Sequence, residues 1–175
     1  PDHREALKWY QKAADQGIAA AQNDAAGMYS NGDATEKEEG KAFSLFLKSA
    51  EQGDPLAENA LAIMYAKGTA TAQDYGEAIR WFMRSAEHGY AEAEMNIARM
   101  YLKGLGVEKS GAAVVKWVRR AAEHGNAEAQ YSLGNMYMTG RLVRQDSMEG
   151  LRWMAEAAAQ GEERAAELLR LLRQG

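Results

Sequence analysis

The 175-residue chain contains no cysteine and only two prolines, and each shortage narrows what the protein can be. Without cysteine there are no disulfides and no thiolate metal ligands. With so little proline, and with Ala, Glu, Leu, Lys, Arg and Gln abundant, helix is favoured nearly everywhere. No apolar run approaches the length of about 20 residues that spans a bilayer. The net charge of −4 argues against a broad basic surface for nucleic acid.

A spacing of 36 residues organises the chain. Glycines follow it without exception, at Gly17, Gly53, Gly89, Gly125 and Gly161. Five further series keep the same step: Gly32, Gly68, Gly104 and Gly140; Tyr29, Tyr65, Tyr101 and Tyr137; Met28, Met64, Met100 and Met136; Ala14, Ala50, Ala86, Ala122 and Ala158; and Trp9, Leu45, Trp81, Trp117 and Trp153. Agreement of six series on one period predicts an array of repeated structural units.

Each repeat is predicted to hold two helices. In the fourth repeat Ala129, Leu133, Met136 and Tyr137 share one helical face, and the second helices carry a similar apolar stripe. A small residue recurs in the first helices, at Ala26, Ala62, Ala98 and Gly134, where it should let a neighbouring helix approach closely. The predicted fold is therefore all-α: a right-handed α/α superhelix, or solenoid, of 36-residue helix–turn–helix repeats.

The predicted helix boundaries have matching chemistry. Gly17 and its equivalents follow the last periodic residue of a second helix, where a left-handed residue is favoured. Asp54 followed by Pro55 suits an N-cap and a first turn. Asp74 with Glu77, and likewise Asp146 with Glu149, have the spacing of a capping box.

These signals predict a single domain over residues 1–175. It comprises a half repeat (1–17), four repeats (18–53, 54–89, 90–125 and 126–161) and a C-terminal capping helix (162–175). The half repeat lacks its first helix, so we expect further repeats upstream in the intact protein. In the last helix Leu169 and Leu172 occupy core positions, whereas Arg170 and Arg173 replace the small residue and the tyrosine. Polar residues there are typical of a terminal repeat, where we expect the array to end.

Two segments carry a resemblance to a known family. Residues 129–140 (AQYSLGNMYMTG) and 116–125 (KWVRRAAEHG) resemble the Sel-one-like repeat (SLR), and 104–107 (GLGV) resembles its interhelical loop. The loops at 32–35 and 68–71 depart from that pattern by lacking the second glycine and the valine. The resemblance covers essentially the whole chain. It implies a tetratricopeptide-type α-solenoid, a scaffold or adaptor role in bacterial protein complexes, location at the cell envelope or outside it, and no shared catalytic residues.

First-helix positions that face away from the second helix differ between repeats, while core positions agree. By analogy with tetratricopeptide arrays, they line a concave groove. In the third and fourth repeats they predict a surface for a peptide or protein segment, made of Met95, Arg99, Leu102, Lys103, Tyr131, Asn135 and Met138. Met and Arg are enriched in interface cores, and Tyr and Arg are typical anchors. Alternatively, Met95 and Met138 fill gaps between adjacent first helices.

Other chemistry finds little support in the sequence. His88 and His124 share a repeat position with Gln16, Gln52 and Gln160, which favours capping of helix carbonyls over metal binding or catalysis. We expect no cofactor and no metal. Two alternatives to an interaction module stay open: a cell-wall or β-lactam hydrolase, which a few SLR relatives resemble, and a regulator of a partner enzyme. Self-association of the chain through its exposed first helix is a further expectation.

Overall fold

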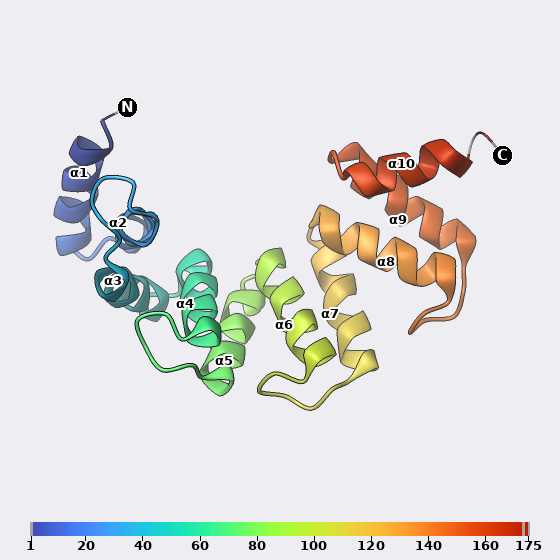
Figure 1. Ribbon diagram of the computed structural model, residues 1–175, viewed down its shortest axis with the longest axis horizontal. Helices are drawn as coiled ribbons and strands as arrows, with labels where there is room; N and C mark the ends of the chain where they lie inside the picture. The colour runs from blue at the N-terminus through green and yellow to red at the C-terminus, as the bar shows by residue number, and fades with distance from the viewer. Residues whose placement is uncertain (1, 173, 175) are drawn as a thin grey trace. The chain divides into compact units, whose positions relative to one another are not determined.

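A computed structural model describes residues 2–172 and 174 of the chain. Within these residues the structure is ten α-helices with no strand, which confirms the predicted all-α repeat fold (Figure 1). The helices are α1 (His3–Asp15), α2 (Ala19–Asn31), α3 (Glu39–Glu51), α4 (Pro55–Lys67), α5 (Tyr75–Glu87), α6 (Ala91–Lys103), α7 (Gly111–Glu123), α8 (Ala127–Thr139), α9 (Ser147–Ala159) and α10 (Glu163–Leu172).

The helices fall into two compact units, which divide between His88 and Gly89. The first unit contains α1 to α5, with α2 packed on α3 and α4 packed on α5 as helical hairpins. The second unit contains α6 to α10, with hairpins α6–α7 and α8–α9 and with α10 packed on α9. The single domain over residues 1–175 stays a prediction.

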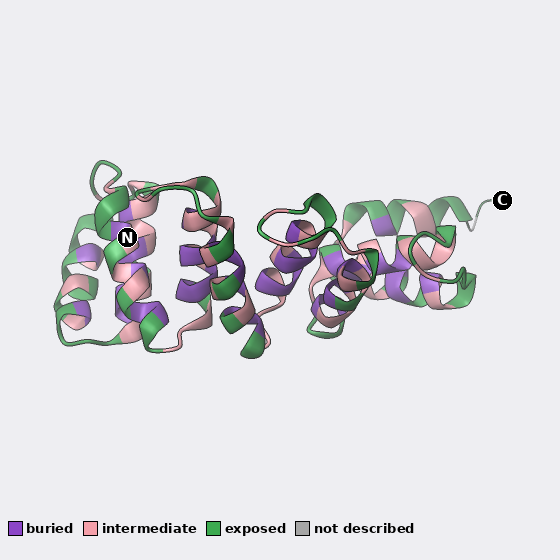
Figure 2. Cartoon of the chain, turned by 90° about the horizontal axis from the view of Figure 1, so that it is seen from below, coloured by how far each residue is buried: buried purple, intermediate pink, exposed green. Residues whose placement is uncertain are grey.

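Each unit buries the faces that its helices turn toward one another (Figure 2). In the first unit Leu7, Tyr29, Phe46, Leu61 and Met64 form one apolar cluster around buried alanines. The small-residue series is buried throughout, as expected. At its last member the two helices are in close contact, because a Cβ built on Gly134 would lie 3.0 Å from the carbonyl oxygen of Gly150 on α9.

Helix ends follow the predicted boundary chemistry. Asp54 caps α4 by accepting hydrogen bonds from the backbone N–H groups of Leu56 and Ala57, with Pro55 in the first turn. Asp74 and Asp146 each accept from the N–H three residues later, at 2.9 and 3.1 Å. The return bond of a capping box is replaced, because the backbone N–H groups of Asp74 and Asp146 donate to the carbonyls of Tyr65 and Tyr137. The Glu77 and Glu149 side chains pair with arginines.

Three of the loops inside hairpins share an unusual backbone conformation. Gly106 has a φ of 67°, and the equivalent Ala70 and Leu142 have φ values of 61° and 67°. The loop at 68–71 therefore keeps the left-handed turn although it lacks the glycine. A side chain in that region costs about 1–2 kcal/mol of strain. The loop at 32–35 differs, since Ala34 is not left-handed.

The C-terminal helix corrects one expectation. Leu169 packs against α9 as a core position should, but Leu172 is exposed, because no further helix of the described chain covers that end of α10. Arg170 is exposed and pairs with Glu167 on its own helix. Arg173 lies outside the described residues.

The loop strain gives a paired prediction. Ala70→Gly should raise the free energy of unfolding by about 0.5–1 kcal/mol, because relief of left-handed strain exceeds the added entropy of the unfolded chain. Gly106→Ala should lower it by about 1 kcal/mol for the converse reason. Urea unfolding followed by circular dichroism measures both changes. Equal signs for the two variants would contradict a shared turn conformation.

The contact at Gly134 gives a second paired prediction. Gly134→Ala should lower the free energy of unfolding by about 1–2 kcal/mol, because the new methyl group would press on the backbone of α9. Its control is Gly27→Ala, since nothing lies within 4 Å of a Cβ at Gly27 in α2. That variant should instead gain about 0.5–1 kcal/mol from helix propensity. The same unfolding experiment measures both, and a neutral Gly134→Ala would contradict the close contact.

Candidate functional site

A small cavity of about 180 Å³ lies on the second unit, between side chains of α6 and α8 and the loop after α8. Leu102, Val114, Met136 and Leu142 are apolar members of its lining, and Leu102 is 52% exposed. Its full lining is Leu102, Val114, Tyr131, Ser132, Asn135, Met136, Thr139, Arg141 and Leu142. Arg141 brings a positive charge to this lining, and no carboxylate of the described chain is part of it.

Three of the seven residues predicted for the binding surface meet at this cavity. Leu102 on α6 lies opposite Tyr131 and Asn135 on α8, which are four residues apart and so share a helical face. Lys103 is exposed at the last position of α6, next to Leu102. The structure therefore brings together the apolar and amide members of the predicted set.

Arg99 already forms hydrogen bonds and ion pairs with residues of its own unit. Its guanidinium donates to Glu128 Oε2 on α8 at 2.7 Å and to Asn96 Oδ1 at 2.8 Å, and it lies 3.8 Å from Glu92 Oε1. These contacts tie α6 to α8 across the surface. A partner would have to compete with two carboxylates for Arg99, so this residue is a weaker candidate anchor than its type suggests.

Met95 and Met138 both pack within the second unit, although Met138 does so against the second helix of its own hairpin and not between first helices. Met95 is only 4% exposed, so its side chain fills space inside the unit. Met138 is half-buried, and a Cβ built on Gly150 would lie 2.8 Å from its sulfur, so Met138 packs toward α9. Neither side chain contributes to the cavity lining.

Sequence reasoning missed the loop that closes the cavity. Leu142 has no apolar counterpart of its size in the other loops, and a Cβ built on Gly111 would lie 2.9 Å from its Cδ2. The loop after α8 therefore packs on the start of α7. The available sequence signal was a leucine at the loop position where the equivalent residues are Ala34, Ala70 and Gly106. In the structure Leu142 is left-handed and 49% exposed.

The ring of Tyr131 is held from its other side. The guanidinium carbon of Arg164 on α10 lies 4.3 Å from the ring centroid, which is a cation–π distance. Tyr131 also packs against the small apolar cluster of α9 and α10. A fixed, half-buried aromatic ring loses little entropy on binding a partner, which suits an anchor.

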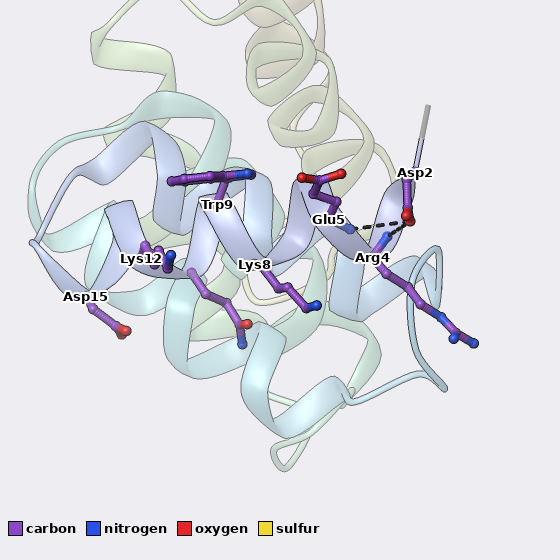
Figure 3. A pocket seen from close by; sticks show the side chains of 8 residues that line it. Asp2, Arg4, Glu5, Lys8, Trp9, Lys12 and Asp15 are labelled. Atoms are coloured by element: carbon purple, nitrogen blue, oxygen red, sulfur yellow. Dashed lines mark hydrogen bonds between the residues drawn. The ribbon is translucent and has the colours of Figure 1, made fainter.

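A larger hollow of about 640 Å³ lies along the outer face of α1 (Figure 3). Its lining comes from this one helix and Asp2, and it is mostly charged. Trp9 is 62% exposed there, with Lys12 over its ring, whereas the equivalent Trp117 and Trp153 are buried. One helix cannot enclose a small ligand, so this face is an uncovered helix surface and not a chemical site.

Two carboxylates are fully buried at equivalent positions in the two units. Glu58 lies 3.1 Å from Arg84 Nε and 3.8 Å from His88 Nε2. Glu94 accepts from Arg120 Nε at 2.9 Å and contacts His124 Nδ1 at 2.9 Å. Burial raises the pKa of Glu58 above its ordinary value, although the nearby Arg84 and His88 oppose the rise.

In the other two repeats, glutamines occupy the positions of the buried glutamate and of the histidine beside it. Gln52 Nε2 donates to Gln22 Oε1, and Gln160 Nε2 donates to Gln130 Oε1, both at 2.7 Å. Gln22 also donates to the Ala14 carbonyl at the end of α1. An ionised glutamate cannot donate a hydrogen bond, so Glu58 cannot bond the equivalent carbonyl, that of Ala50. Arg84 donates to this carbonyl instead.

The difference between the glutamate and glutamine repeats corrects the expected role of the two histidines. It also decides whether the glutamate–histidine pairs could be catalytic. His88 and His124 were expected to cap carbonyls, but their side chains contact the buried glutamates. A buried carboxylate beside a histidine is a feature that a hydrolase could use. However, Glu58 and Glu94 are 0% exposed, so no substrate reaches them, and the glutamine pairs show that the position serves hairpin packing.

No group of three or more His, Cys, Asp or Glu side chains among the described residues is arranged to hold a metal ion. None of the helices described above is both long and apolar enough to cross a membrane.

The Sel1 repeat model matches residues 1–18, 19–54, 55–90, 91–126 and 127–162, which is nearly the whole chain. The chain belongs to the Sel1 repeat family. This confirms the resemblance to Sel-one-like repeats. The family's units begin one residue after the predicted ones, at the same 36-residue step.

Solved structures support the assignment of this Sel1 repeat chain. A Sel1 repeat protein from Oxalobacter formigenes is 40% identical, with a TM-score of 0.87 over 93% of this chain and 66% of that one. A protective antigen of uropathogenic Escherichia coli with an SLR fold is 31% identical, with a TM-score of 0.86 over 94% of this chain and 35% of that one. An immunity protein from Pseudomonas aeruginosa, 22% identical with a TM-score of 0.61 over 91% of this chain and 59% of that one, shares the fold. No curated protein matches.

The Sel1 repeat chain spans just under two thirds of the first of these relatives and about one third of the second. Sel1 repeat proteins generally mediate protein–protein interaction, and the scaffold is typically non-catalytic. Proteins are therefore the partner class that the family indicates.

The buried carboxylates give a testable substitution series. The triple variant Glu58→Gln, Arg84→Lys and His88→Gln copies Gln22, Lys48 and Gln52, and it should unfold within about 1 kcal/mol of the parent. Arg84→Ala with His88→Ala alone should cost about 2 kcal/mol or more, because Glu58 is then buried without the guanidinium and the imidazole that lie beside it. Urea unfolding at neutral pH compares them.

The pH dependence of the free energy of unfolding, measured on the same variants, tests the raised pKa of Glu58. A carboxyl whose pKa is raised in the folded state binds its proton more tightly there than in the unfolded state. The parent should therefore gain stability relative to the triple variant as pH falls from 7 toward the ordinary glutamate value near 4.5, and no more below it. A parallel pH profile for the two proteins would count against this account.

Proposed function

We propose that this Sel1 repeat chain is a non-enzymatic interaction module, a bacterial adaptor whose second unit binds a peptide or protein segment along α6 and α8. The observation that carries the proposal is the α6–α8 cavity, where an exposed leucine from a helix and another from a loop face a fixed tyrosine. Exposed leucines of this kind, grouped around one hollow and edged by polar side chains, are typical of interaction sites.

The size of the cavity favours a protein partner over a small molecule. Pockets for cofactors and metabolites usually measure about 300–1,000 Å³ and enclose most of the ligand. A cavity of about 180 Å³ accommodates one apolar side chain. A segment that inserts one side chain there can also contact the neighbouring polar groups of Asn135 and Thr139 along α8.

The differences between repeats agree with this assignment. At the position of Leu102 the other first helices carry Ser30, Ala66 and Met138, and at the position of Tyr131 they carry Asn23, Asn59 and Met95. The combination of exposed leucine and half-buried tyrosine thus occurs at one place in the array. A site confined to one place is what recognition of a particular partner requires.

Selection from a random dodecapeptide library displayed on phage tests the proposal. The immobilised chain should enrich peptides that share an apolar anchor, and a labelled copy should bind in solution by fluorescence anisotropy. Leu102→Ser and Tyr131→Ala should each weaken that binding by more than about 1 kcal/mol, or roughly fivefold. Arg99→Ala should have a smaller effect, because Arg99 is already paired with Glu128.

The control is Leu56→Ser in the first unit, where an exposed leucine lies on α4 outside the cavity. It should leave the affinity unchanged. No enrichment over the unselected library, or equal losses for Leu56→Ser and Leu102→Ser, would end the proposal.

A further inference from the structure

The loops beside the cavity carry a group of positive charges, which we call the basic edge: Lys103, Lys109, Arg141 and Arg144. Lys103 ends α6, Lys109 lies in the loop before α7, and both arginines lie in the loop after α8. The two loops are neighbours, because Leu142 of one reaches the α7 start at Gly111 that follows the other. Arg141 itself lines the cavity.

These four cations lack the partners that other cations of the unit have. Arg99, Arg120, Arg152, Arg164 and Arg170 all pair with glutamates. Among the described residues, no carboxylate lies within 4.0 Å of a side-chain nitrogen of the basic edge. Two carboxylates occur in the same loops, Glu108 and the helix cap Asp146, so the loops with Lys103 sum to +2 in a chain of net charge −4.

Interaction with a helix dipole explains the position of Lys103 but not the positions of Arg141 and Arg144. A lysine in the last turn of α6 is stabilised by the partial negative charge of that helix end. Arg141 and Arg144 lie one and four residues beyond Gly140, the C-cap of α8, and are not needed for that purpose. The equivalent residues of the first hairpin are Asp33 and Glu36, so the same loop tolerates the opposite charge.

From these observations, and resting on the proposed function, we infer that the bound segment is acidic: its apolar anchor enters the cavity, and an Asp or Glu close by in its sequence faces the basic edge. Opposite charge at the rim speeds association and fixes the orientation of the segment. The apolar cavity next to the cations favours a peptide over a nucleic acid, whose phosphates would use the basic edge and leave Leu102 without a contact.

The first hairpin supplies the variant that tests the inference. Arg141→Asp with Arg144→Glu places the residues of the 32–38 loop into the loop after α8 and leaves Leu102, Tyr131 and Leu142 in place. The phage selection is run on the parent, on this loop variant and on Leu102→Ser, after circular dichroism has confirmed equal helix content. The readout is the frequency of Asp and Glu within three positions of an apolar residue.

The parent should enrich acidic residues beside the anchor, and the loop variant should enrich Lys and Arg there instead. For a peptide selected on the parent, replacing its acidic residue by the matching amide should weaken binding about threefold to fivefold on the parent. The same replacement should strengthen binding to the loop variant, because it removes a repulsion between like charges. Raising the salt concentration should reduce only the acidic peptide's advantage.

The possible outcomes distinguish the inference of an acidic segment from the proposed function. Peptides that depend on Leu102 but show no charge preference would overturn the inference and leave the proposed function standing. No enrichment on the parent would remove both. A fluorescein-labelled single-stranded DNA dodecamer serves as the polyanion probe, and binding of this probe as tight as that of the acidic peptides, unaffected by Leu102→Ser, would also overturn the inference.

Discussion

The close approach of the two helices in each hairpin is the constraint on which the rest of the structure depends. It is possible because the first helix carries only Ala or Gly at the contact, from Ala26 to Gly134, and these residues are buried. Where the partner helix also offers glycine, at Gly150, the backbones are so close that a Cβ on either glycine would lie only 3.0–3.1 Å from the other's carbonyl oxygen. Helices held this close leave no enclosed space between them, so the cavity lies at the rim, where a loop meets two helices.

The 36-residue period predicted the helices, their caps and the buried series, because these features repeat and depend on short-range spacing. The cavity could not be predicted in the same way, since it depends on Leu142 of one loop reaching back to Gly111 of the preceding hairpin. Met95 and Leu172 show a second limit. Repeat position indicates average burial, but Met95 lies deeper than a surface position should, and Leu172 is exposed because no further described helix covers α10.

The buried carboxylates show how different residues meet the same requirement. The carbonyl near the end of each preceding helix needs a donor, which Gln22 and Gln130 supply for Ala14 and Ala122. Where glutamate replaces glutamine, the arginine donates in its place for Ala50 and also balances the buried charge. Position 58 can therefore be understood only together with 84 and 88. A single-position comparison would read the histidine as a catalytic or capping residue.

Packed side chains between the helices and variable residues in the loops have different roles, and this explains why we propose that partners are recognised at the loops. Side chains between the helices are fixed by packing, so they vary little and can distinguish no partner. The loops carry Asp33 and Glu36 in one hairpin and Arg141 and Arg144 in another, on helices of equal length. Because charge at the loops changes while the helices do not, each unit can present a different electrostatic surface on one backbone. The chemistry of a partner is then set locally, by the loop and the exposed side chains nearest to its anchor.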